Sequence, residues 1–248
     1  MRYFRAAIRI SLFFGMTFCV YLIWFLGSFA VRNKIHWRRM IFRFWSKSFI
    51  RISGMTVKTI GSPPQAPFIL VSNHLSYVDV AVFGSLLETV FVAKSDVGKW
   101  FIAGKIIRDF GTIFVDRNNR RDIPRAGRKI IDAFRSGDGV VVFPEGTSTC
   151  GDRVLPFNPA LLDTAAKNKL AVSYASITFK TPDSEPGAAI SVCWWDETVF
   201  IAHLWRLFSL RGFTSFVHFG TEPIADPDRK ELARLLRAGV LEIFVPID

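Results

Sequence analysis

The chain begins with a long uninterrupted run of apolar residues. Residues 10–31 form a stretch of 22 positions without a formal charge, long enough for a helix that crosses a bilayer core, which needs about 20 apolar residues. A signal peptide would have a shorter apolar region of roughly 7–15 residues and a small-residue cleavage site, whereas Arg32, Asn33 and Lys34 follow here. The run therefore predicts a membrane helix rather than a cleaved leader or a helix of a soluble core.

The next segment, residues 34–52, mixes apolar and basic positions. Its aromatic and aliphatic residues alternate with basic ones, namely Arg38, Arg39, Arg43, Lys47 and Arg51. This composition is typical of helices that lie in the membrane interface. The two segments predict either a spanning helix followed by an interfacial helix, or a helical hairpin within one leaflet. The larger basic cluster follows the apolar run, which favours the cytoplasm for the remaining chain. We therefore expect the protein at the cytoplasmic face of a membrane, specifically the bacterial inner membrane.

After a linker rich in proline at residues 61–67, short apolar segments alternate with longer helical ones. The expected strands are 68–72, 90–93, 112–115, 139–143, 171–179, 189–195 and 214–219, and the expected helices are 78–87, 97–110, 125–136, 160–167, 198–210 and 228–243. Short unbroken apolar strands between helices indicate a buried, largely parallel sheet with helices on both faces. The sequence thus predicts an α/β fold, with residues 1–60 as N-terminal membrane-anchoring helices and residues 61–248 as the globular domain.

Charge is distributed unevenly along the chain. The 248 residues carry a formal net charge of +11, with 32 Lys and Arg against 21 Asp and Glu. The first acidic residue is Asp79, and eleven basic residues precede it, so the remaining chain is neutral. The whole excess therefore surrounds the apolar run. We expect this segment to contact an anionic lipid surface, which excludes nucleic acid as the partner.

Composition excludes two further classes of protein. Half of the residues are hydrophobic, which an intrinsically disordered chain does not have. The cysteines, Cys19, Cys150 and Cys193, are too few and too scattered for a disulfide framework, and no Cys-x-x-Cys pair is present to bind zinc. We therefore expect no metal site.

Ligand-binding and catalytic groups of such a sheet gather where strands end and helices begin. The first of these junctions places His74 directly after an expected strand and Asp79 near the start of a helix. Positions five apart on a regular helix point about 140° apart, but a turn between them lets the carboxylate fold back onto the imidazole. A carboxylate that accepts the Nδ1 proton leaves Nε2 free as a base. An incidental histidine beside a capped helix is the alternative that this junction leaves open.

Two further junctions carry candidate binding groups. Arg117 follows the strand at 112–115, where a guanidinium can hold a phosphate in a bidentate manner, although surface ion pairing explains it equally well. Glu145 and Gly146 follow the strand at 139–143, where a carboxylate beside backbone N–H groups can bind a polar head group. The alternative for this third segment is an ordinary turn.

Taken together and in this order, the three segments resemble the motifs of the glycerolipid acyltransferase family, in particular the 1-acyl-sn-glycerol-3-phosphate acyltransferases (lysophosphatidic acid acyltransferases). The matching residues are Asn73, His74 and Asp79 for Asn-His-x-x-x-x-Asp, Gly111, Phe114 and Arg117 for Gly-x-x-Phe-x-x-Arg, and residues 143–147 for Phe-Pro-Glu-Gly-Thr. The N-terminal anchor extends the likeness over most of the chain. The resemblance makes residues 61–248 an acyltransferase domain.

Two departures from the family pattern concern substrate preference. Where the family often has Phe-Lys-x-Gly after the third motif, residues 157–160 read Phe-Asn-Pro-Ala, and where its fourth motif has Val-x-Pro, residues 172–175 read Val-Ser-Tyr-Ala. Both lie outside the catalytic pair. They leave the reaction class intact and make other acceptors, such as a lyso-ornithine lipid, an open alternative.

The resemblance implies transfer of a fatty acyl group from acyl-CoA or acyl-acyl-carrier-protein to the free hydroxyl of a lysophospholipid, without a cofactor or metal. His74 would act as the general base, oriented by Asp79. Asn73, Gly111 and Arg117 would bind the substrate together with the third-motif residues Glu145, Gly146 and Thr147. No Gly-x-Ser-x-Gly nucleophile elbow is present, in agreement with direct attack by the hydroxyl.

Two other classes of function remain as alternatives. A membrane-bound lipid hydrolase would use a cysteine or serine nucleophile such as Cys150, although no motif marks that thiol as activated. A non-catalytic lipid-binding protein would have no need of the intact His74 and Asp79 pair. The segment at 193–195 and His203 are expected to pack in the core rather than to line an acyl tunnel.

Overall fold

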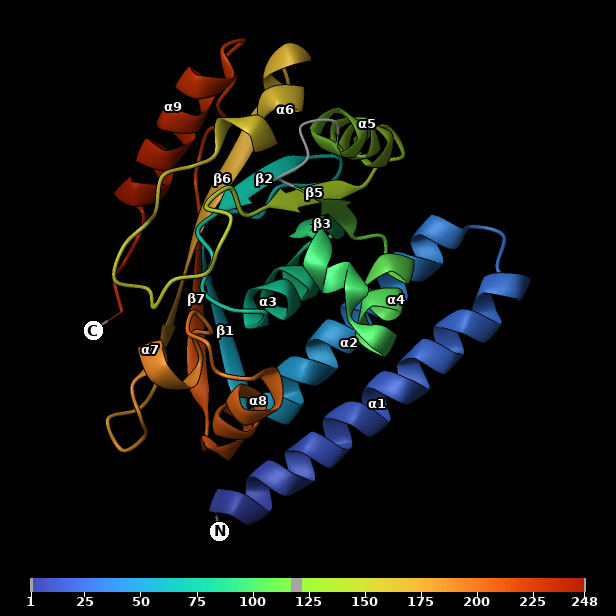
Figure 1. Ribbon diagram of the computed structural model, residues 1–248, viewed down its shortest axis with the longest axis vertical. Coiled ribbons are helices and arrows are strands. Elements are labelled where there is room, and N and C mark those ends of the chain that lie inside the picture. The colour runs from blue at the N-terminus through green and yellow to red at the C-terminus, as the bar shows by residue number, and fades with distance from the viewer. Residues whose placement is uncertain (1, 117–121, 248) are drawn as a thin grey trace.

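The computed structural model describes residues 2–116 and 122–247, which form a seven-stranded sheet with helices on both faces (Figure 1). The strands are β1 (Met55–Ile60), β2 (Ile69–Ser72), β3 (Thr89–Lys94), β4 (Ile113–Val115), β5 (Gly139–Val142), β6 (Val172–Lys180) and β7 (Phe213–Phe219). The α-helices are α1 (Arg2–Ala30), α2 (Lys34–Ser53), α3 (Val78–Leu86), α4 (Phe101–Asp109), α5 (Asp122–Arg135), α6 (Asp163–Lys167), α7 (Ala188–Ser191), α8 (Phe200–Ser209) and α9 (Arg229–Glu242). Two short 3-10 helices are η1 (Ser95–Lys99) and η2 (Pro159–Leu161).

The strand order is β1-β7-β6-β2-β5-β3-β4, and every neighbouring pair is parallel except β6 and β7. The predicted α/β fold with a largely parallel sheet is therefore confirmed. All residues of β2 and β5 are buried, as expected for strands covered on both faces. Val71 pairs with Val142, so these two central strands end side by side and direct the residues that follow them to one edge of the sheet.

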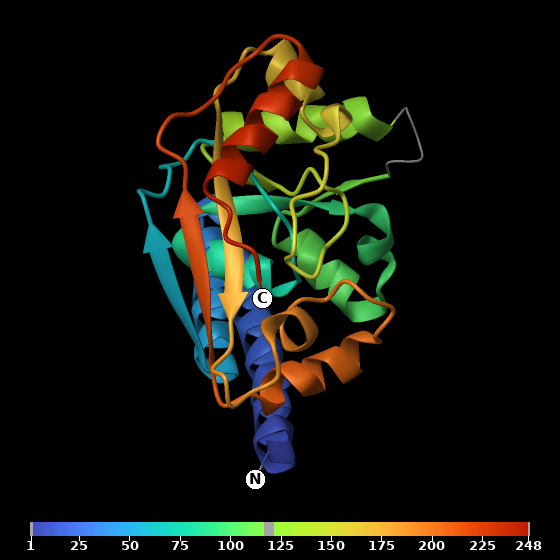
Figure 2. The same ribbon diagram turned by 90° about the vertical axis from the view of Figure 1, so that its left-hand side faces the viewer.

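Two apolar cores hold the helices against the sheet. One core joins it to α1, α2, α3 and α8, and the other joins it to α5, α6 and α9. Figure 1 shows α5, α6 and α9 on one side and the remaining long helices on the other, and Figure 2 shows the same division from the side. Because both faces are covered, the exposed edge at which the strands end is where polar groups can meet a substrate.

Three parts of the sequence prediction differ from the structure. Residues 189–195 do not form a strand: α7 ends at Ser191, and the backbone N–H of Trp194 binds the carbonyl of Leu75 rather than a strand. The segment at 55–60, which has mostly exposed positions, forms β1 by pairing with β7. The expected helix at 97–110 is divided at Trp100, whose extended backbone separates η1 from α4.

Helix α1 has 29 residues and a mean hydropathy of 2.0 in its most apolar stretch, of which only 11% is buried. By length and composition it is a candidate membrane span, and its exposure argues against a core helix of a soluble protein. Its N-terminal arginines bind the C-terminal end of α8, since Arg5 donates to the carbonyl of Ser209 (2.6 Å) and Arg9 to that of Leu210 (2.6 Å). Near its other end the Tyr21 hydroxyl donates to Asp109 of α4 (2.6 Å). Both ends of α1 thus contact the same α/β body.

Helix α2 lies between α1 and α3 and places basic residues inside the protein. Arg38 and Arg39 bind opposite oxygens of Asp138 at 2.6 and 2.7 Å, and Asp138 is buried. These two arginines therefore join α2 to the turn before β5, and like Arg5 and Arg9 they bind groups of the protein rather than lipid head groups, which the charge pattern had suggested. The proposed division of the chain at residue 60 stays a prediction, and β1 joins the residues before it to the sheet.

Candidate active site

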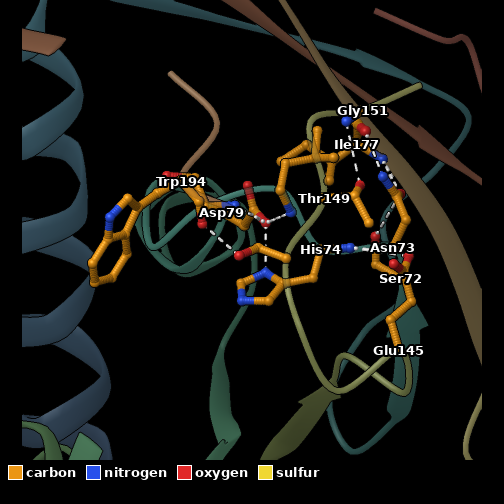
Figure 3. A network of polar contacts seen from close by, with 12 residues as sticks. Ser72, Asn73, His74, Asp79, Glu145, Thr149, Gly151, Ile177 and Trp194 are labelled. Atoms are coloured by element: carbon orange, nitrogen blue, oxygen red, sulfur yellow. Dashed lines mark hydrogen bonds and ion pairs between the residues drawn. The ribbon is translucent and has the colours of Figure 1, made fainter. Parts of the chain in front are cut away.

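The turn that joins β2 to α3 is organised by one carboxylate oxygen. Asp79 Oδ2 lies 2.7 Å from His74 Nδ1 and accepts hydrogen bonds from the backbone N–H groups of Leu75 (2.7 Å) and Ser76 (3.1 Å). Asp79 is fully buried in the first turn of α3, where the N-terminal end of a helix stabilises negative charge. The structure therefore brings the predicted pair together in the expected arrangement (Figure 3).

The imidazole of His74 is held on one side and accessible on the other. Its ring stacks on Phe143 with centroids 4.2 Å apart, and 24% of the side chain is exposed. With Nδ1–H donating to Asp79, the tautomer places the lone pair on Nε2. The ring is thus fixed by stacking and one hydrogen bond and can accept a proton at its open nitrogen.

Asn73 has a structural contact that its sequence position did not reveal. Its carboxamide binds both backbone groups of Ile177 in β6, accepting from the N–H at 2.8 Å and donating to the carbonyl at 2.9 Å. The side chain is fully buried. Asn73 thereby continues the pairing of β2 with β6 by one side chain and fixes the point at which the chain leaves the sheet before His74.

Glu145 lies directly beside the His74 turn because β5 is the neighbour of β2. Its Oε1 accepts from the backbone N–H of His74 at 3.3 Å, while Oε2 is buried without a hydrogen-bond partner among the described residues. Burial raises the pKa of the Glu145 carboxyl to about 8, against the opposing effect of the backbone N–H groups of Leu155 and His74. This carboxyl therefore supports the backbone of the site and is held largely neutral at pH 7.

The remaining residues of the third motif form a turn over the site. Gly146 has a φ of +81°, and its N–H binds the Phe143 carbonyl at 3.2 Å, so a residue without a side chain suits this position. Thr147 is exposed next to it. Beyond the motif, the N–H of Thr149 binds the carbonyl of His74 at 3.0 Å. The predicted cluster of His74, Glu145, Gly146 and Thr147 is thus contiguous.

The second motif is only partly described. Gly111 precedes β4 and has a φ of +89°, and a side chain there would collide with Arg38 of α2. It therefore lies at the opposite end of β4 from the strand exit, in a packing position away from His74. Arg117, the predicted phosphate ligand, lies outside the described residues. Arg125 of α5 pairs with Asp122 at 2.5 Å.

A second series of polar contacts supports the site from α8, and no sequence motif predicted it. The buried His203 lies 3.1 Å from the Tyr77 hydroxyl and 2.9 Å from the Cys193 carbonyl. Burial lowers the pKa of His203 to about 4, so the neutral ring accepts from Tyr77 through Nδ1 and donates to Cys193 through Nε2. The next residue, Trp194, binds the Leu75 carbonyl at 2.8 Å. The presence of His203 within a largely apolar helix was the feature of the sequence that could have indicated a buried polar contact.

The core packing predicted for His203 and Cys193 is confirmed, since both are buried, whereas Trp195 is exposed. The Cys150 thiol donates to the Asp152 carboxylate at 3.2 Å, rather than to a histidine as in a cysteine hydrolase. Residues 2–116 and 122–247 contain no cluster of three or more His, Cys, Asp and Glu side chains that could hold a metal ion. The arrangement can therefore accept a proton at His74 and bind a polar group at the adjoining turn.

Comparison with known proteins agrees with this geometry. The sequence model of the Acyltransferase family matches residues 54–178 of this chain. The lyso-ornithine lipid O-acyltransferase of Pseudomonas aeruginosa is 30% identical to this chain, and the alignment covers 82% of this chain and 78% of that protein. The lyso-ornithine lipid O-acyltransferase of Brucella abortus is also 30% identical, over 83% of this chain and 82% of that protein. The 1-acyl-sn-glycerol-3-phosphate acyltransferase of Neisseria gonorrhoeae is 28% identical over 64% of this chain and 63% of its own.

A solved structure shares the fold. The crystal structure of the 1-acyl-sn-glycerophosphate acyltransferase PlsC from Thermotoga maritima superposes with a TM-score of 0.67 over 98% of this chain and 97% of that one. At 22% identity, this likeness concerns the architecture, including the N-terminal helices.

Proposed function

The chain belongs to the acyltransferase family, and from that premise we propose that it transfers a fatty acyl group from acyl-CoA or acyl-acyl-carrier-protein to the free hydroxyl of lysophosphatidic acid, giving phosphatidic acid. The observation that carries the proposal is the His74–Asp79 pair, with 2.7 Å between Nδ1 and Oδ2. A secondary alcohol is a poor nucleophile until its proton is removed, and this pair provides a base at the place where an acceptor can approach.

The reaction follows from the open nitrogen of His74. As the acceptor hydroxyl oxygen attacks the thioester carbonyl carbon, Nε2 takes the hydroxyl proton, and Asp79 stabilises the imidazolium through Nδ1–H. The tetrahedral intermediate then expels the thiolate, and His74 returns the proton to that sulfur. The ester and free thiol are the products, and no acyl-enzyme forms because the hydroxyl attacks directly.

Binding of the acceptor head group is assigned to the turn beside His74. Gly146 and the exposed Thr147 lie at the edge where β2 and β5 end. Strand β4, after which Arg117 comes in the sequence, ends at the same edge. Glu145 acts differently from a head-group ligand, since its carboxyl faces the backbone of His74. We therefore assign Glu145 and Asn73 to positioning the His74 turn.

A second acceptor is supported by a specific observation. Three relatives that are 30–31% identical over at least 80% of this chain are lyso-ornithine lipid O-acyltransferases, and the departures at residues 157–160 and 172–175 concern acceptor preference. A lyso-ornithine lipid presents an amino-acid head group in place of a phosphate and offers a hydroxyl that the same His74 can deprotonate. The two acceptors therefore differ in the head-group site and share the base.

The membrane is the expected location because the acceptor is a lipid and the donor arrives from water. Helix α1 exposes its apolar side chains, and both of its ends contact the α/β body through Arg5, Arg9 and Tyr21. A helix bound at both ends cannot leave the body to cross a bilayer, so these contacts support the arrangement in one leaflet. The cytoplasmic face of the inner membrane is the side on which both thioester donors occur.

The proposal is tested by a matrix of donors and acceptors with the full chain in nanodiscs. Acyl-CoA and acyl-acyl-carrier-protein are each combined with lysophosphatidic acid, a lyso-ornithine lipid or no acceptor, and thiol release is measured. Release that requires lysophosphatidic acid and is lost in His74→Ala and Asp79→Ala supports the proposal, and dependence on the lyso-ornithine lipid supports the second acceptor. Release without an acceptor that is lost in Cys150→Ala would identify a hydrolase, and no release with any pair would identify a binding protein.

A further inference from the structure

Beyond α1 and α2, the body exposes a group of large apolar side chains at the beginnings of α4 and α8. The group consists of Phe101, Ile102, Val199, Ile201 and Trp205, and we call it the apolar ridge. Its members have exposed fractions between 38% for Trp205 and 95% for Phe101. Single exposed apolar residues are ordinary on protein surfaces, whereas a contiguous group marks a site of interaction.

The two halves of the apolar ridge are joined by an aromatic cluster. Trp100, which precedes α4, lies 5.9 Å from the ring of Phe200 in α8 and 6.3 Å from the ring of Trp194. These contacts bring residues about 100 positions apart in sequence to one place. In Figure 2, α4 (green) and α8 (orange) both lie on the right-hand side of the sheet.

Helix α8 connects the apolar ridge to α1, because its C-terminal residues contact α1 and the exposed Trp205 lies between them and Ile201. Phe13 of α1 contacts Phe208 of α8 with ring centroids 5.7 Å apart, and Trp24 of α1 contacts Phe110 beyond α4 at 5.7 Å. Helix α1 therefore passes both elements that carry the ridge. Because α1 itself exposes large apolar side chains over most of its length, the ridge extends an apolar surface that a bilayer can cover.

Charges border this surface in the pattern of an interfacial segment. Residues 94–109 contain four basic and two acidic residues, which leaves a net charge of +2, and the exposed Lys99 and Lys105 pair with Asp96 and Asp109 beside the ridge. Lysine next to apolar side chains attracts anionic lipid. Asp196 and Glu197 precede Val199, and their charges limit the depth to which the α8 end can enter.

The apolar ridge also lies next to the His74 turn. The ring of Phe200 is 5.1 Å from that of Tyr77, and the N–H of Trp194 binds the Leu75 carbonyl at 2.8 Å. Only one layer of side chains thus separates the ridge from the turn that holds His74. A lipid acceptor that leaves the bilayer along the ridge would have a short path to the base.

We propose that the apolar ridge inserts into the head-group region of the same leaflet as α1 and forms a second membrane contact, which opens the active site toward the bilayer. The occupant is a lipid bilayer because α4 and α8, which carry the ridge, both contact α1, whose apolar side chains are exposed. The proposal rests on the proposed function only for the statement that the acceptor comes from that leaflet.

The experiment locates single residues relative to lipid without using activity. Cys19→Ser and Cys150→Ser remove the two accessible thiols and leave the buried Cys193. Phe101→Cys and Ile201→Cys are then labelled with the fluorophore NBD in nanodiscs of phosphatidylethanolamine and phosphatidylglycerol. We expect blue-shifted emission at both sites, quenching by lipids brominated on their acyl chains, and protection from aqueous iodide.

Leu241→Cys and Val245→Cys are the matched controls, because both positions carry exposed apolar side chains near α9, on the other side of the sheet. Their labels should be quenched by iodide and unaffected by brominated lipid. Iodide quenching at 101 and 201 as strong as at 241 would overturn the proposal. Protection that appears only at high protein concentration or on addition of acyl carrier protein would also overturn it, in favour of a protein partner. A protein without acyltransferase activity that passes the labelling test would leave the ridge contact intact and refute the proposed function alone.

Discussion

The side chain of Asn73 binds both backbone groups of Ile177, at 2.8 and 2.9 Å, and so joins the end of β2 to β6 where the regular pairing stops. Ser72 is the last residue of β2 and pairs with Ala175, so the amide of Asn73 takes the place of the next backbone pair. The direction in which His74 leaves the sheet depends on this contact, because the carboxamide is fully buried and held at two atoms.

We predict that Asn73→Ala destabilises the protein and lowers kcat. Loss of two buried hydrogen bonds, with two backbone groups of Ile177 left unpaired, costs about 2 kcal/mol. Asn73→Asp has the same shape but cannot donate to the Ile177 carbonyl, and its charge would be buried, so it should be at least as harmful. Denaturant unfolding and turnover check both variants. Wild-type stability and kcat in Asn73→Ala would contradict the positioning role.

Asp79→Asn should lower kcat by about 100- to 10,000-fold, the usual range for a general base and its partner. An amide that turns its NH₂ toward His74 Nδ1 would favour the tautomer with the proton on Nε2, which cannot act as a base. Thiol release gives the rate, and circular dichroism verifies folding. Asp163→Asn is the control, because Asp163 pairs with Lys167 and Arg229 on α6 and α9, far from the site. Similar losses in both variants would argue for a general effect on stability.

The raised pKa of Glu145, about 8 against an ordinary value of 4.5, predicts a specific dependence of stability on pH. Between these two pKa values the unfolded chain has lost the proton and the folded chain keeps it. The contribution of Glu145 to the free energy of unfolding is therefore full below about pH 4.5 and is lost as the pH rises through 8. The limit of the effect is on the order of 5 kcal/mol. Glu145→Gln keeps an oxygen for the His74 N–H and should remove this dependence.

Unfolding in urea from pH 5 to pH 9 measures that difference. Relative to wild type, Glu145→Gln should gain stability as the pH rises. Glu242→Gln, at an exposed position of α9, should show no such trend. Parallel curves for wild type and Glu145→Gln would show that the carboxyl is ionised in the folded protein.

His203 predicts the opposite trend in acid. Its pKa of about 4 in the folded protein lies below the ordinary value of 6.5. Between these values only the unfolded chain takes up the proton. The contribution of His203 to the free energy of unfolding is therefore full above about pH 6.5 and is lost as the pH falls toward 4. The loss is at most about 3 kcal/mol. His203→Gln should flatten the stability curve in this window, and the exposed His36→Gln should leave it unchanged. An equal acid dependence in all three proteins would exclude His203 as its source.

The contacts of α1 with α8 predict that the anchor helix depends on its arginines. In Arg5→Ala and Arg9→Ala combined, the carbonyls of Ser209 and Leu210 lose charged donors, which should cost about 1–3 kcal/mol, since positive charge and hydrogen bonding stabilise the C-terminal end of a helix. Limited proteolysis should cut α1 away from the body sooner than in wild type. Arg32→Ala, in the exposed turn before α2, is the control. Equal cleavage rates would mean that apolar packing alone holds α1.

The sequence by itself determined the parts of this protein that depend on local pattern. Residues 10–31 could only be a long apolar helix, short apolar runs such as 139–143 became buried strands, and the Asn-His-x-x-x-x-Asp spacing brought His74 and Asp79 together, because hydrophobic period and turn geometry act over a few residues. Each of these was predicted without knowledge of any distant contact.

Only the tertiary structure decided which distant groups meet. The polar segment at 55–60 became a strand because β7 supplied its partner. Residues 189–195 stayed outside the sheet, because α7 and the hydrogen bond between Trp194 and Leu75 hold them. The side chain of Asn73 binds Ile177, and Gly111 lies against the side chain of Arg38. Their positions in the motifs had suggested that both residues bind the substrate. Pairing and burial involve residues far apart in the chain, and the free energy of such contacts does not appear in any local pattern.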